Sequence, residues 1–116
     1  MDTTQQIDRY QTLVIDFLSE QQDPNSNTEE YQRLMLADKE HRHYQLIATG
    51  WASPSQYVDA ILIHLTIKPT GKVWLLENST ELHVAEELVA RGIARTDIVL
   101  AFHPPQYRAL SGYAAA

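Results

Sequence analysis

Cysteine is absent from this chain of 116 residues, and glycine is scarce, with only four residues. The absence of cysteine excludes disulfide frameworks, thiolate nucleophiles, iron–sulfur clusters and thiolate zinc sites. The four glycines do not cluster, so no glycine-rich loop is available to cradle a phosphate group. A cysteine-free chain fits a reducing compartment, and we expect the protein to be cytoplasmic.

Basic residues and long hydrophobic runs are also lacking. Nine Lys and Arg stand against fifteen Asp and Glu, a net charge of −6 that falls mostly on residues 1–50. Such a chain gains little from counterion release, so autonomous, non-specific binding to DNA or RNA is disfavoured. The longest apolar stretch, Ala60–Leu65, is interrupted by His64 and is too short to cross a bilayer. No signal peptide is recognisable at the start, and we expect no membrane contact.

What remains is the composition of a globular protein. Hydrophobic residues make up 44% and charged residues 21% of the chain, which excludes wholesale disorder. The length suits one compact core, so we expect a single domain over residues 1–116. Helical and alternating hydrophobic patterns both occur, and together they predict an α+β fold.

The N-terminal segment has the pattern of an amphipathic helix over residues 4–20. Apolar side chains recur there every three or four positions, and Asp2 or Thr3 can cap the start. The polar stretch Gln21–Thr28 contains Pro24 and predicts a loop.

Four strand patterns follow with short connections, at about 30–37, 43–51, 56–68 and 72–77. They predict an antiparallel meander, with Ile67 opposite Val73 across the loop Pro69-Thr70-Gly71. The expected pairs at the other turns are Leu46 with Ile61, Tyr44 with Ile63, Leu36 with Tyr44, and Leu34 with Leu46. This register gathers one apolar face, because side chains alternate along a strand. Its members are Leu34, Leu36, Tyr44, Leu46, Ile61, Ile63, Leu65, Ile67, Val73 and Leu75.

The opposite face of this sheet is unusually apolar for a solvated surface. We expect it to be covered by a partner, by a second copy of the chain, or by the tail after Pro105. The residues predicted to form this interface are Trp51, Leu62, His64, Trp74 and Leu76.

A second helix is predicted over residues 81–91, capped by Thr80 and packed on one face of the sheet. Ile98–Phe102 reads as a short strand or buried extended segment. The prolines after His103 end regular pairing, and at most one helical turn is expected in the tail.

Residues capable of chemistry are present, but none forms a specific motif. His41 and His43 have a spacing that metal ligands use, with His64, His83 or His103 as a conceivable third ligand. We interpret them as half-exposed hairpin residues and predict no metal, cofactor or catalytic residue. The alternative is a small hydrolase that uses His64 or His103 with Asp97 or Glu81, which requires a cleft that brings two such groups together.

Several stretches together resemble the XisI-like family, the fdxN-element excision controlling factors of cyanobacteria. They are HRHYQLIATGW at 41–51, IKPTGKVW at 67–74, AEELVARGI at 85–93 and DIVLAFHPPQYR at 97–108. The last is the most specific. Matching positions whose role is unknown are Thr80, Asp97, Phe102, His103, Pro105 and Arg108.

The resemblance implies an accessory protein in programmed DNA excision during heterocyst development. A separate site-specific recombinase performs the strand chemistry, and a XisH-like protein is the implied partner. We therefore expect a non-catalytic factor that acts through protein contacts, without a small-molecule substrate and with self-association as a further option. Direct DNA binding is the alternative, for which Lys68, Lys72, Arg91, Arg95 and Arg108 would have to converge.

Overall fold

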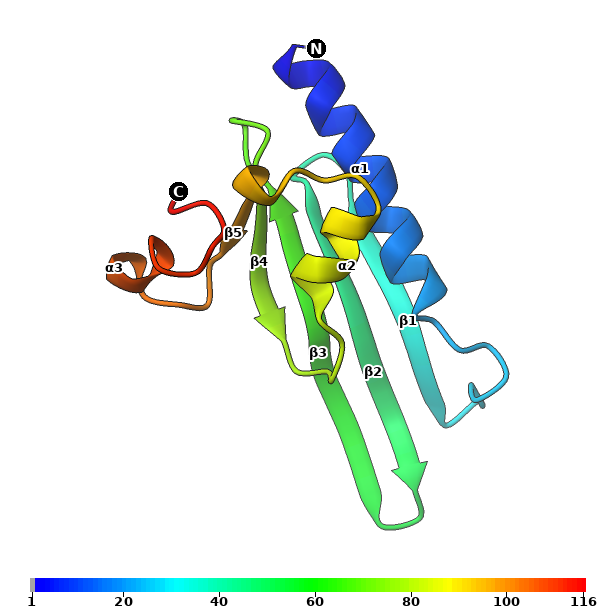
Figure 1. Cartoon of the computed structure of the whole chain (residues 1–116). Coiled ribbons are helices and arrows are strands. Elements are labelled where there is room, and N and C mark those ends of the chain that lie inside the picture. The colour runs from blue at the N-terminus through cyan, green and yellow to red at the C-terminus, as the bar shows by residue number, and fades with distance from the viewer. Residues whose placement is uncertain (1) are drawn as a thin grey trace.

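A computed structural model describes residues 2–116 and shows one twisted sheet with two helices on the same face (Figure 1). The chain runs through α1 (Thr3–Glu20), β1 (Tyr31–Asp38), β2 (His43–Ser53), β3 (Gln56–Ile67), β4 (Val73–Asn78), α2 (Val84–Ala90), a 3-10 turn (Arg95–Asp97), β5 (Ile98–Leu100) and α3 (Pro105–Arg108). The predicted α+β class is confirmed. The sheet has five strands in the order β1-β2-β3-β4-β5, because Ile98–Leu100 adds to β4 in parallel.

Helix α1 is capped at its start by Asp2, one of the two capping residues that the sequence predicts. The carboxylate of Asp2 accepts the Gln5 N–H at 2.8 Å, and the Gln5 side chain accepts the Asp2 N–H in return. This capping box satisfies two amides of the helix start. The buried stripe of this helix consists of Tyr10, Val14, Phe17 and Leu18, at the three- and four-residue spacing of an amphipathic helix.

The core lies between this stripe, α2 and one face of the sheet. Its sheet residues include Tyr44, Leu46, Ile63 and Leu65, each fully buried, and α2 adds Val84, Ala85 and Leu88. The Tyr44 hydroxyl donates to Gln11 Oε1 at 2.6 Å, so the Gln11 side chain satisfies this buried phenol. Burial raises the pKa of Tyr44 to about 12. Within residues 2–116, no helix has the length and hydrophobicity needed to span a membrane.

The predicted register holds between β3 and β4 and is wrong at the two preceding hairpins. Ile67 pairs with Val73 and Leu65 with Leu75, as expected. Between β1 and β2, however, Leu34 pairs with Ile47, and Leu36 with Gln45. The turn is one residue shorter than predicted, because Asp38 joins the strand and its carboxylate accepts the His41 N–H at 3.1 Å. Leu34 and Leu36 therefore lie on the opposite face from the core.

A β-bulge moves the register of β3 in the same way. Leu46 pairs with Ile63, but its neighbour Ile47 pairs with Ile61, so Leu62 is an extra residue in β3. An extra residue exchanges the two faces for everything beyond it. Ile61, predicted to lie in the core, is therefore 44% exposed on the other face. Leu62, predicted to be on the interface, instead packs against the core.

The second helix is shorter than predicted, and Thr80 does not cap it. Helix α2 begins at Val84, and the residue before it, His83, makes no side-chain cap hydrogen bond. Thr80 instead donates its hydroxyl to Asn78 Oδ1 at 2.6 Å, and Asn78 Nδ2 donates to the Leu82 carbonyl at 2.8 Å. The Asn78 side chain thus holds residues 79–82 in a turn, so the helix begins later in the chain than predicted.

Gly50 provides a test of how closely β1 and β2 are joined. Its φ is +114°, and a Cβ at this position would lie 1.8 Å from the Glu30 carbonyl oxygen, which accepts the Trp51 N–H. We expect Gly50→Ala to lower the free energy of unfolding by about 2 kcal/mol or more, since positive φ and a backbone clash add. Denaturant titration measures this change.

Gly112→Ala is the matched control. Gly112 also has positive φ, +83°, but no atom lies within 4 Å of its added Cβ. The substitution Gly112→Ala should therefore lower the free energy of unfolding only by the cost of a left-handed backbone, about 1 kcal/mol. Equal destabilisation by the two substitutions would show that the contact with Glu30 is not a constraint.

Candidate functional site

The face of the sheet turned away from α1 and α2 is the candidate site. We call it the free face. Exposed apolar side chains come from three strands and include Leu36 at 44%, Ile61 at 44%, Trp51 at 48% and Tyr57 at 59% exposure. Pairing of Leu34 with Ile47, and of Ile47 with Ile61, places three aliphatic side chains in a row across β1, β2 and β3. Trp51 and Tyr57 lie at the end of the same face, edge to face with ring centroids 5.3 Å apart.

The free face therefore differs in membership from the predicted interface, although its apolar character is as expected. Trp51 and His64 lie on it, and Leu62 does not, because of the bulge. Leu76 is the extra residue of a second bulge, since His64 pairs with Glu77 while Leu65 pairs with Leu75. Leu34, Leu36 and Ile61 are the members that the predicted register placed in the core.

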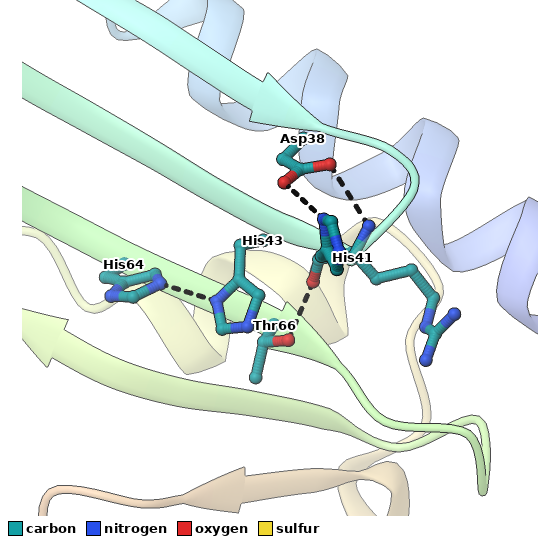
Figure 2. A network of polar contacts seen from close by, with 6 residues as sticks. Asp38, His41, His43, His64 and Thr66 are labelled. Carbon is teal, nitrogen blue, oxygen red and sulfur yellow. Dashed lines mark hydrogen bonds and ion pairs between the residues drawn. The ribbon is translucent and has the colours of Figure 1, made fainter.

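Two histidines form a polar pair on the free face, where β2 begins (Figure 2). His43 Nδ1 and His64 Nε2 are 2.9 Å apart, and the ring centroids are 5.1 Å apart with the planes tilted by 49°. One nitrogen must donate and the other accept, so the bond requires that the two rings do not both carry two protons. Burial, followed by the nearby charge of His43, lowers the pKa of His64 below its usual 6.5.

The neighbouring polar groups close the β1–β2 turn. The hydrogen bond from the His41 backbone N–H lowers the pKa of Asp38, and the His41 ring, whose Nδ1 lies 2.8 Å from Asp38 Oδ2, lowers it further. The Thr66 hydroxyl donates to the Arg42 carbonyl at 2.7 Å. Figure 2 shows His41 directed to Asp38, whereas His43 is directed to His64. Among residues 2–116, no three His, Cys, Asp or Glu side chains gather as a metal site.

The groups required by the hydrolase alternative have other contacts. Asp97 Oδ2 accepts the Tyr10 hydroxyl at 2.6 Å, which ties α1 to the 3-10 turn. His103 lies exposed against Phe102, with ring centroids 4.6 Å apart, and its carbonyl accepts from Arg108 Nε at 3.0 Å. His64 has an imidazole partner and no carboxylate hydrogen bond. No pair of the proposed catalytic groups is joined by a hydrogen bond in residues 2–116.

The five basic residues that DNA binding would need do not all converge. Lys68 Nζ lies 4.8 Å and Arg108 Cζ 5.2 Å from the Trp74 ring centroid, so two cations flank this indole. Arg95 stacks on Tyr113, and Lys72 donates to the Ala116 carbonyl. Arg91 instead pairs with Glu20, between α1 and the end of α2. Arg108 also links the tail after Pro105 to the residue that follows the last strand. Its Nη2 donates a hydrogen bond to the Ala101 carbonyl at 2.9 Å.

The histidine pair generates a pH prediction. Because the folded-state pKa of His64 is lowered, the unfolded chain takes up this proton first as the pH falls below 6.5. The contribution of His64 is therefore present above pH 6.5, and the free energy of unfolding declines below it. NMR titration of the imidazole signals measures the pKa. His43→Gln should move the His64 value toward 6.5 without reaching it, because burial remains; a His64 pKa at or above 6.5 in the unaltered protein would contradict the geometry.

Comparison with known proteins agrees with the resemblance seen in the sequence. The family model for XisI protein matches residues 1–115. A XisI-like protein from Anabaena variabilis ATCC 29413 is 30% identical, with a TM-score of 0.79 over 99% of this chain and 100% of that one. The fdxN element excision controlling factor XisI of the same organism is 28% identical, with a TM-score of 0.78 over 96% and 99%. No curated protein matches. The chain belongs to the XisI family.

Proposed function

We propose that this protein is a non-catalytic controlling factor for excision of a DNA element, and that it acts by docking a protein partner on the free face. The observation that carries the proposal is the exposure of Leu36, Ile61, Trp51 and Tyr57 on one side of the sheet. Large apolar side chains exposed together on one face mark interaction sites in soluble proteins. The name of the related controlling factor agrees with a regulatory role rather than an enzymatic one.

The free face shares the aromatic and aliphatic content of protein interfaces. The aliphatic row lies between the His43–His64 pair and the two aromatic rings at the other end. Two carboxylates lie among these side chains, since Asp38 pairs with His43, and Asp59 pairs with Thr49 beside the aliphatic row. Interface cores are apolar and rich in aromatic residues, and charges are depleted there. A histidine pair inside such a surface adds a directional polar contact that an aliphatic patch lacks.

The partner that the family resemblance implies is a XisH-like protein, with a recombinase complex on DNA as the wider assembly. The tail is not the occupant of the whole face, because Ile61 and Leu36 stay exposed with the tail folded. Its Arg108 reaches Trp74 and no farther along the apolar row.

Direct contact with DNA is the second candidate, and the two cations on Trp74 favour it. Lys68 and Arg108 could contact phosphates while the indole stacks on an unpaired base. Two cations on a protein of net charge −6 give a small electrostatic gain, so we rank this candidate below partner docking.

Co-expression with a XisH-like protein tests the first proposal. We expect co-elution in size-exclusion chromatography, and we expect Ile61→Asp to weaken the complex about tenfold or more, because a carboxylate would be buried in an apolar interface. Leu110→Asp is the control. Leu110 is 84% exposed and lies in the tail after α3, so it also gains a charge but not on the sheet. Unaltered co-elution of Ile61→Asp would exclude the free face as the docking site.

A gel-shift measurement with the purified protein separates the second candidate. We expect no shift of duplex or single-stranded DNA at about 150 mM salt, where few phosphate contacts give little affinity. A shift that is lost in the double variant Lys68→Ala, Arg108→Ala would favour direct DNA binding instead.

A further inference from the structure

The outer edge of β3 has an unpaired stretch. β3 extends over twelve residues, but β4 pairs only with Ile63–Ile67. After Asn78 the chain leaves the sheet, and the Ser79 N–H makes the last contact, to the Leu62 carbonyl at 2.8 Å. Within residues 2–116, no strand pairs with the outer side of 56–61. Figure 1 shows the β2–β3 hairpin extending beyond the end of β4.

The other edges of the sheet are protected by the chain itself. On β1, the N–H of Arg33 donates to Asn27 Oδ1 at 3.0 Å and that of Met35 to Gln22 Oε1 at 2.8 Å. On β5, the Ala114 N–H donates to the Ile98 carbonyl at 2.8 Å. Exposed edges invite pairing with another strand, and natural proteins usually block them. Here one edge is left open while the loop and the tail close the others.

The pairing pattern identifies the groups that face outward on the open edge. The Trp51 N–H donates to Glu30 on the β1 side, so the backbone of the preceding residue, Gly50, faces β3. Gly50 pairs with Val58, whose backbone therefore faces β2. Since these directions alternate along a strand, the N–H and C=O groups of Tyr57, Asp59 and Ile61 face outward.

We propose that the occupant of this edge is a second copy of the same chain, paired antiparallel through β3 about a two-fold axis at Val58. Tyr57 of each copy then lies opposite Asp59 of the other, so two of the three outward residues form hydrogen-bonded pairs. The two pairs exchange about four hydrogen bonds, and the two Val58 residues meet at the axis as a close, non-hydrogen-bonded pair.

Side-chain chemistry selects this register over its neighbours. A shift by two residues in one direction sets Asp59 opposite Asp59 of the second copy, and like charges directly opposite destabilise a sheet. A shift in the other direction moves Asp59 opposite Ser55, which lies in the turn after β2, so only Tyr57 keeps a partner within the strand. The register centred on Val58 has no like-charged pair and keeps both Tyr57 and Asp59 paired, with Ile61 opposite Ser55. It also places the Trp51–Tyr57 ends of two free faces side by side, and it does not depend on the partner proposed above.

The direct test is the mass of the purified chain in solution by light scattering. We expect twice the 13.2 kDa of one chain. Asp59→Pro removes an outward N–H and should give a monomer with an unaltered fold by circular dichroism, because proline is tolerated at a free strand edge. Ala37→Pro is the matched control. Ala37 is exposed on β1 and has the same outward direction as Met35, so this variant should stay dimeric.

A cross-linking experiment keeps the proposal falsifiable if a proline variant fails to fold. The chain has no cysteine, so Val58→Cys introduces a single thiol at the axis. Cα atoms of such a pair are about 4.5 Å apart, within the range of a disulfide. Mild oxidation should yield a disulfide-linked dimer for Val58→Cys and not for Ala37→Cys. A single-chain mass at every concentration, a dimeric Asp59→Pro variant, loss of the dimer in Ala37→Pro, or no cross-link at Val58→Cys would each overturn the proposal.

Discussion

The burial of one sheet face beneath α1 and α2 is the constraint on which the rest of this structure depends. Val14, Phe17 and Leu18 of α1 occupy the same core as Leu46 and Ile63, and each of these side chains is almost completely buried. Removing this apolar surface from water supplies the main stabilisation of a chain this small. Two helices are enough to cover one face only. Everything apolar on the other face therefore needs a different explanation.

The bulge at Leu62 decides which residues need that explanation. Without it, the alternation along β3 would place Ile61 on the same face as Ile63. With it, Ile61 lies beside Ile47 on the free face, and Leu62 joins the core. Bulges often occur where a side chain has to be redirected, and here the result is an aliphatic row in front of the His43–His64 pair. One extra residue thus moves Ile61 from the face predicted to form the core to the exposed face of the sheet.

Much of this fold could be predicted from the sequence, and the errors in that prediction have physical causes. Helix α1, the loop after it and the β3–β4 hairpin follow from local patterns, namely a capping residue, a three- to four-residue period and Gly71 in a short turn. The face of Leu36 could not be predicted, because it depends on Asp38 entering the strand and bonding His41. The face of Ile61 depends on a bulge, which alternation alone does not reveal. Strand β5 pairs in parallel with β4, which is distant from it in sequence, and no local sequence signal identifies such a partner.

Docking of a partner would make the free face inaccessible to solvent, and Trp51 can report this directly. Trp51 is 48% exposed on that face, and Trp74 is the only other tryptophan. In a Trp74→Phe variant, Trp51 is the single tryptophan of this chain, so acrylamide quenching, corrected for that of the XisH-like partner alone, measures the exposure of Trp51. We expect quenching to fall sharply in the complex. A complex that forms while Trp51 stays equally accessible would contradict the docking of a partner on the free face.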